Sequence, residues 1–105
     1  DPLNARALLS LGQYYGRLRP ADDKERIEAV ELALVYYQRA QELIKRDGPG
    51  DAESTRLAYV GEGQLLTRER RLREALKALE EAQRIERHER IANYIEMIRR
   101  VSEGR

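Results

Sequence analysis

The amino-acid sequence predicts an all-α protein that forms a single domain over residues 1–105. Helix-forming Ala, Leu, Glu and Arg are abundant, and the chain has only three prolines. Apolar residues recur every three or four positions, as one face of a helix requires. No stretch alternates apolar and polar residues convincingly, so we expect no strands. A length of 105 residues fits one domain and not two.

The composition favours a binding function over a catalytic one. Hydrophobic residues make up 41% of the chain, enough for a core, and charged residues make up 37%. Twenty Lys and Arg against nineteen Asp and Glu leave a net charge of +1, which argues against a nucleic-acid or membrane-surface binder. The sequence has no Cys and one His, which leaves almost no material for a metal site or a catalytic pair. We therefore expect no enzyme activity, no cofactor and no metal.

The sequence also bears on localisation. It contains no signal-peptide pattern and no apolar run close to the ~20 residues of a membrane helix. The chain opens at Asp1 without an initiator Met, which indicates either a processed product or a piece of a longer protein. The default expectation is a cytoplasmic location with no membrane partner.

Two long helices are expected in the first half of the chain. The first spans about residues 3–18 and ends before Pro20, with an apolar face of Leu8, Leu11, Tyr15 and Leu18. Asp22 or Asp23 caps the second, which extends to about residue 46. Its apolar face consists of Ile27, Val30, Leu34, Tyr37, Ala40 and Ile44.

Three further helices are expected after the breaker sequence of residues 47–50. The third begins at residue 51 or 52 and ends near Arg68, and a tight turn at residues 69–71 leads to the fourth, at 72–86. The fifth covers about residues 89–102. Their apolar positions are Leu57, Val60, Leu65 and Leu66, then Leu72, Ala75, Leu76, Leu79, Ala82 and Ile85, then Ile91, Tyr94, Ile95, Ile98 and Val101.

Two patterns recur in the same order along the chain. Gly12, Gln13 and Arg17 return 51 residues later as Gly63, Gln64 and Arg68. A second set returns 42 residues later: Ala33, Leu34, Tyr37, Ala40, Gln41 and Leu43 match Ala75, Leu76, Leu79, Ala82, Gln83 and Ile85. The offsets differ by nine, so the first helix pair carries an insert, which falls within residues 19–28.

These residues resemble the tetratricopeptide repeat (TPR) family. The positions that carry the resemblance are Leu8, Leu11-Gly12 and Tyr15 in the first unit, Tyr59, Gly63 and Leu66 in the second, and the sets Ala33-Tyr37-Ala40 and Ala75-Leu79-Ala82. Glu62 departs from the pattern at a Leu position. The spacing of 42 is similar to the longer repeats of the kinesin light chain type, which also occur in bacterial proteins. Small residues at these places let two helix backbones approach closely.

The resemblance implies a TPR-like α-α superhelix. Its two antiparallel helix pairs would cover about residues 3–46 and 52–86, with the helix at 89–102 as the start of a third unit or as a cap. In this family the first helix of each pair lines a concave peptide-binding face. The residues implied to line it are Arg6, Leu9, Gln13, Arg17, Leu57, Val60, Gln64 and Arg68.

The implied function is a protein-protein interaction module that binds an extended peptide, with acidic or amide side chains, on this concave face. Arg17 and Arg68 have an alternative role as helix C-terminal residues favoured by the helix dipole. The chaperone-type carboxylate clamp needs Lys and Asn where this chain has Leu9, Gln13, Val60 and Gln64, so that function is rejected. The alternative to peptide binding is a structural, designed or excised repeat scaffold whose main partner is itself.

Self-association is expected through the C-terminal helix. Met97 widens the apolar stripe of that helix beyond what one neighbour needs, and exposed apolar surface of this kind usually marks an interface. The candidate contact residues are Tyr94, Met97, Ile98 and Val101. The alternative is that the whole stripe folds back onto the second pair and leaves a monomer.

Other motifs carry little chemistry. His88-Glu89 begins like a zinc-protease motif but has no second His. The basic run of residues 68–73 is typical of a solvated turn, although it could touch an acidic partner. Tyr15 and Tyr37 are expected in the core, which leaves Tyr14 and Tyr36 for an edge or the groove.

Overall fold

The computed structural model describes residues 4–47 and 52–104, with the side chains of residues 47 and 52 outside the description. Within these residues the helices are the only regular secondary structure and there is no strand, which confirms the predicted all-α class with five helices. The helices are α1 (Ala5–Arg17), α2 (Asp23–Asp47), α3 (Ala52–Arg68), α4 (Leu72–Ile85) and α5 (Glu89–Ser102). None of the described helices is long and apolar enough to cross a membrane.

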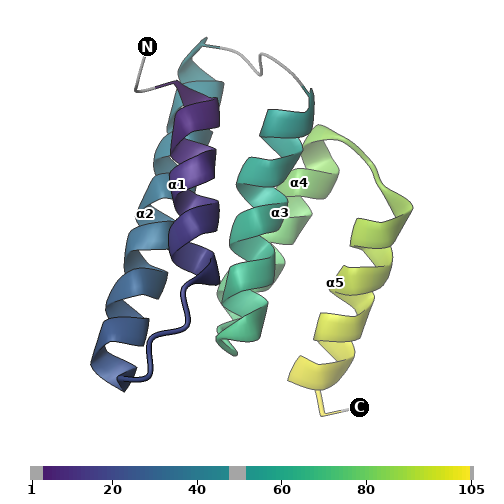
Figure 1. Ribbon diagram of the computed structural model, residues 1–105. Helices are drawn as coiled ribbons and strands as arrows, with labels where there is room; N and C mark the ends of the chain where they lie inside the picture. The colour runs from purple at the N-terminus through teal and green to yellow at the C-terminus, as the bar shows by residue number, and fades with distance from the viewer. Residues whose placement is uncertain (1–3, 48–51, 105) are drawn as a thin grey trace.

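The helices form two layers and alternate in direction (Figure 1). One layer holds α1, α3 and α5, and the other holds α2 and α4. α1 packs mainly against α2, and α3 against α4, while α2 meets α3 and α4 meets α5. The principal extents of 45 × 37 × 17 Å fit this flat arrangement. One broad face of the molecule is therefore built from α1, α3 and α5.

Glycines set the closest approaches between helices. A Cβ on Gly63 would lie 2.6 Å from Leu79 Cγ, and one on Gly12 would lie 3.3 Å from three atoms of the Tyr37 ring. Gly61 faces the same ring from α3, where a Cβ would lie 2.6 Å from Tyr37 Cε1. A helical Gly costs about 1 kcal/mol relative to Ala, and the close packing offsets that cost. Tyr37 thus sits between α1 and α3 and joins the two helix pairs.

The nine-residue insert does not form a long loop. Asp22 Oδ2 accepts a hydrogen bond of 3.1 Å from the Glu25 backbone N–H and so caps α2 at its start. More than half of residues 19–28 thus lie in the first turns of α2, which extend past the end of α1 (Figure 1). Ile27 lies on this overhang and is 53% exposed, contrary to its predicted place on the apolar face, because α1 ends before it can cover that position.

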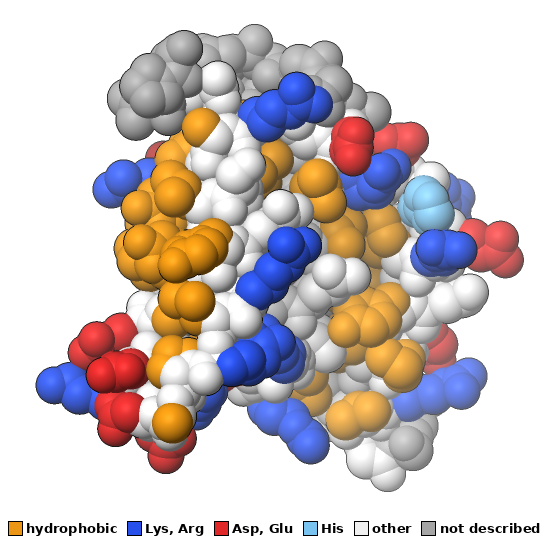
Figure 2. All heavy atoms as spheres, in the orientation of Figure 1, with side chains coloured by type: hydrophobic (Ala, Val, Ile, Leu, Met, Phe, Trp, Pro, Cys, Tyr) orange, Lys and Arg blue, Asp and Glu red, His pale blue; other side chains and the backbone are white. Residues whose placement is uncertain are grey.

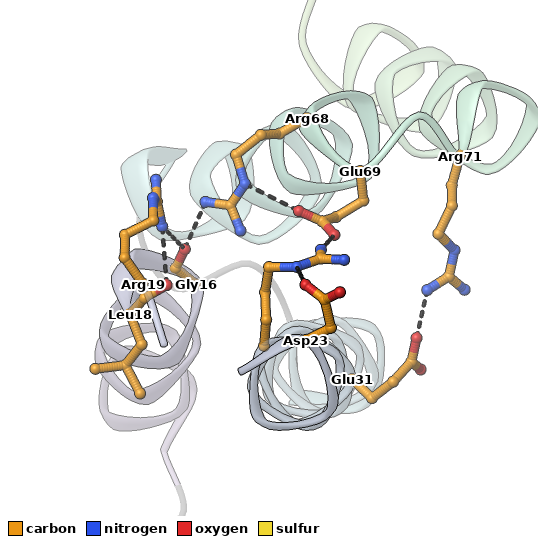
Figure 3. A network of polar contacts seen from close by, with 9 residues as sticks. Gly16, Leu18, Arg19, Asp23, Glu31, Arg68, Glu69 and Arg71 are labelled. Carbon is orange, nitrogen blue, oxygen red and sulfur yellow. Dashed lines mark hydrogen bonds and ion pairs between the residues drawn. The ribbon is translucent and has the colours of Figure 1, made fainter. Parts of the chain in front are cut away.

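Ion pairs tie the overhang to the turn between α3 and α4 (Figure 3). Arg26 on α2 pairs with Glu69, and Arg71 pairs with Glu31 on α2. Arg70 adopts a left-handed backbone conformation, with φ at 64°, that closes the turn. The insert therefore gives α2 a polar contact with the end of α3, where it has no α1 to pack against.

Two further apolar positions differ from the prediction. Leu11 is 38% exposed, while Leu8, Leu9 and Gly12 are buried in its place. α1 contacts both α2 and α3, and its buried arc is turned toward the side that faces these two neighbours. Ile85 is 46% exposed because it is the last residue of α4 and no neighbouring helix covers it there.

Candidate functional site

A pocket of about 260 Å³ lies between α1 and α3, toward their C-terminal ends. Five of the eight expected groove residues line it: Gln13, Arg17, Leu57, Gln64 and Arg68. Its other lining residues are Gly16, Tyr37, Gly61 and Leu65. None of them carries a carboxylate, so the pocket presents two guanidinium and two amide groups around an apolar floor.

The other three expected groove residues lie elsewhere. Val60 lines a second pocket, between α3 and α5. Leu9 is only 4% exposed and belongs to the core, so its predicted place in the lining of the concave face is wrong. Its side chain packs in the hydrophobic core cluster with Leu8, Val30 and Leu65 among others. Arg6 is exposed on the first turn of α1 and does not line the α1–α3 pocket.

The second pocket has a volume of about 400 Å³ and continues the same face. Its apolar lining residues are Val60, Leu79, Ile91 and Tyr94, and its polar ones are Arg56, Gln64, His88 and Arg90. Gln64 lines both pockets, which makes them neighbours across α3. In Figure 2 cationic side chains run along this face between two hydrophobic groups, and most acidic side chains gather at its edges.

Arg17 and Arg68 differ in what they contact. Arg68 Nη1 donates a hydrogen bond of 2.6 Å to the carbonyl oxygen of Gly16, and its Nε donates one of 3.2 Å to Glu69 (Figure 3). It therefore stabilises the end of α1, a helix other than its own, by satisfying a terminal carbonyl. Arg17 forms no ion pair with any residue in the described part of the chain. Arg17 is the guanidinium that is left to meet a ligand.

Tyr37 forms part of the floor of the α1–α3 pocket. Burial of its ring raises the pKa of its hydroxyl, and the charges of Arg17 and Arg68 partly oppose that rise. Tyr37 stays neutral at physiological pH and offers the pocket an aromatic surface.

The buried carboxylate of Glu62, which departs from the repeat pattern, is satisfied by hydrogen bonds from α2. The side chain is 8% exposed and accepts hydrogen bonds from Gln38 Nε2 at 3.2 Å and from Gln41 Nε2 at 3.1 Å. Gln41 Nε2 also donates to the carbonyl oxygen of Ala58 at 2.9 Å. The amide groups thus satisfy a buried carboxylate at a position where the family pattern has Leu. This cluster lies between α2 and α3, and none of its residues lines either of the two pockets.

The tyrosines divide differently from the prediction. Tyr37 is buried as expected, but Tyr15 is only half-buried. Its ring stacks on that of Tyr36, with centroids 5.8 Å apart and planes at 11°. Tyr14 is 59% exposed and meets Tyr15 edge to face, with centroids 5.1 Å apart. The stacked rings of Tyr15 and Tyr36 thus join α1 to α2, and both pack partly buried against the core.

The four self-association candidates are not equivalent. Ile98 is 1% exposed and packs in the core of the single chain, so its proposed contact with a second copy is wrong. Ile91 and Ile95 are buried with it. Tyr94 is half-buried and lines the α3–α5 pocket, while Met97 and Val101 are largely exposed. Of the four candidates, Met97 and Val101 are the two whose side chains are exposed enough to meet a partner.

Sequence reasoning missed three polar residues of the α3–α5 pocket: Arg56, His88 and Arg90. A signal for Arg56 was present, because Arg56, Val60, Gln64 and Arg68 follow one another at intervals of four and so share a helix face. Arg90 likewise lies four residues before Tyr94, so these two also share a helix face. The described residues contain no cluster of His, Cys, Asp and Glu that could hold a metal ion.

No protein-family model, curated protein or solved structure matches the chain.

Proposed function

We propose that this chain is a TPR-like interaction module that binds an extended peptide on the face formed by α1, α3 and α5, without catalysis. The observation that carries the proposal is the α1–α3 pocket, whose lining has two guanidinium groups, two side-chain amides and no carboxylate. Such a lining suits acidic or amide side chains, since a guanidinium forms charge-assisted hydrogen bonds with carboxylates.

The repeated packing supports the TPR-like part of the proposal. Gly12 meets Tyr37, and Gly63 meets Leu79, so matching positions of the two sequence repeats make matching contacts. Each contact joins the first helix of a pair to the second. A superhelix with a concave first-helix face is the arrangement that the family resemblance implies, and it is part of this proposal.

The test begins with a random dodecapeptide library selected on the immobilised chain. We expect the recovered peptides to be enriched in Asp and Glu. The best of these, labelled with fluorescein, then gives a Kd for each variant. Arg17→Gln should raise that Kd about tenfold and flatten its salt dependence, because one charge-assisted contact is lost.

Arg39→Gln is the matched control. Arg39 is exposed on α2, and it lines neither pocket of the α1–α3–α5 face. Its replacement removes the same charge and should leave the Kd unchanged. Arg68→Gln is a less clean variant, since Arg68 also holds the end of α1. Recovered peptides without acidic enrichment, or equal effects of Arg17→Gln and Arg39→Gln, would refute the proposal.

The alternative of a self-associating scaffold has one observation in its favour. Met97 and Val101 on α5 are 49% and 56% exposed. Two such side chains form a small patch, and the surface they offer is less than the sequence alone suggested. We therefore rank self-association below peptide binding.

A further inference from the structure

We propose that the pocket between α3 and α5 binds an organic anion with one carboxylate and an apolar body. The pocket's volume of about 400 Å³ falls within the range of small-ligand sites. Its lining contains a cationic group of Arg56 and Arg90, the imidazole of His88, and an apolar group of Val60, Leu79, Ile91 and Tyr94. This site shares Gln64 with the α1–α3 pocket, but Arg56, Arg90 and its apolar side chains line the α3–α5 pocket and not the other, so the inference does not depend on peptide binding between α1 and α3.

The cationic group is available for a ligand. Neither Arg56 nor Arg90 forms an ion pair with any residue that the structure describes. Two carboxylates of α4 are already engaged, because Glu80 pairs with Arg99 at 2.8 Å and Glu81 pairs with Arg84. No lining residue carries a negative charge that would compete with an anion.

Arg56 is the stronger of the two guanidinium groups for this purpose. It is half-buried, whereas Arg90 and His88 are exposed. A partly desolvated guanidinium interacts more strongly with an anion than one in bulk water, because the effective dielectric constant is lower. Arg56 and Arg90 approach from α3 and α5 respectively, so a carboxylate between them would bridge the two helices.

The apolar group determines the rest of the ligand. Leu79 is fully buried and Ile91 nearly so, and both lie at the base of the pocket. The half-buried Tyr94 adds an aromatic surface. A strongly hydrated dianion would gain nothing from these side chains, whereas an aliphatic or aromatic body would be removed from water by them. The chemistry that fits both groups is a carboxylate on an apolar body.

Two sources carry this chemistry: a free organic acid, and the last residue of a peptide that ends in an apolar side chain. Both are tested on the full chain labelled with ¹⁵N, by following amide chemical shifts. The first probe is 4-phenylbutyrate, and its neutral isostere is 4-phenylbutyramide. The second probe is a hexapeptide that ends in Leu, with a free or an amidated C-terminus.

We expect at least one carboxylate probe to shift amide signals of α3 and α5 in a saturable way. Its neutral partner should bind about tenfold more weakly, since the charge-assisted hydrogen bonds are absent. The double variant Arg56→Gln, Arg90→Gln should bind the carboxylate probe more weakly than the parent by a similar factor. The probe that binds more tightly identifies the source.

Matched variants distinguish carboxylate binding in the α3–α5 pocket from peptide binding in the α1–α3 pocket. Arg39→Gln and Arg17→Gln each remove one Arg outside the pocket lining, and both should leave the carboxylate affinity unchanged. A well-dispersed spectrum of the double variant establishes that it is folded. The proposal is overturned if neither carboxylate binds, if the neutral isosteres bind equally well, or if the double variant binds as the parent does.

Discussion

Single residues decide how closely the helices of this chain approach. Tyr37 has a glycine on each side, Gly12 on α1 and Gly61 on α3, and a Cβ at Gly61 would overlap the ring. Gly16 also lies on α1, but a Cβ there would have Leu65 and Ala33 at 3.8 and 3.9 Å, an ordinary contact distance. Two helical glycines therefore differ in whether a methyl group can be added.

We predict that Gly61→Ala and Gly16→Ala change stability in opposite directions. Gly61→Ala should lower the free energy of unfolding by about 1–3 kcal/mol, because overpacking outweighs the gain in helix propensity. Gly16→Ala should raise it by up to about 1 kcal/mol, since only the propensity gain applies. Urea denaturation monitored by circular dichroism measures both. Equal effects of the two changes would mean that Tyr37 does not lie against Gly61.

Tyr37 also predicts a pH dependence. Burial raises the pKa of Tyr37 above the value of about 10 that Tyr has in an unfolded chain. At higher pH the unfolded state loses this proton first and so binds fewer protons than the folded state, and the free energy of unfolding falls. The stabilisation is complete below about pH 10 and is lost as the pH rises through the folded-state pKa.

Tyr37→Phe removes this ionisation, so its stability should fall less steeply above about pH 10 than that of the parent. Urea denaturation from neutral pH to about pH 11 gives the comparison. Part of the alkaline loss should remain in the variant, because burial also raises the pKa of Tyr59. Tyr14→Phe, at an exposed ring, controls for the loss of a hydroxyl. Identical pH profiles for Tyr37→Phe and the parent would contradict the assignment.

At the scale of elements, the helices were predictable and their buried faces only in part. Turn signals such as Pro20 and residues 47–50 act locally, so the division into five helices could be read from the chain. The buried arc of α1 could not, because it depends on α3, which comes more than thirty residues later. Leu9 and Leu11 exchange their expected places for this reason.

The candidate site shows the same limit. The interval of 51 residues picked out Gln13 and Gln64 together with Arg17 and Arg68, which line one pocket. The α3–α5 pocket was missed because the recurring patterns do not include α5, so nothing in the sequence indicated which α5 residues face α3. A structure was needed to bring Arg56 and Arg90 together, since they lie on different helices.

At the scale of the whole molecule, α5, the last of the described helices, keeps one apolar strip exposed. Burial of Ile91, Ile95 and Ile98 against the preceding helix leaves Met97 and Val101 on the outer side. Exposed apolar surface of this kind usually marks an interface. Weak pairing of two chains through α5 would cover it by a two-fold contact.

We therefore predict a concentration-dependent mass in sedimentation equilibrium, with association at high protein concentration. Met97→Glu should abolish the association, because it places a charge in the centre of the apolar strip. Ile27→Glu is the matched control, since Ile27 is also about half exposed but lies on α2. A monomer mass at every concentration would exclude association through α5. If the Met97→Glu variant still dimerises, the contact between the two chains lies elsewhere.

The Tyr37 ring has a consequence for how the chain unfolds. It belongs to the first helix pair but fills a space that the second pair leaves open at Gly61. In a linear array, cooperativity depends on how much of the stability resides in the junction between units and how much within each unit. Separation of the two helix pairs would expose the Tyr37 ring on the first pair and the backbone around Gly61 on the second. The junction therefore couples the units, and the two pairs should melt together in a single transition.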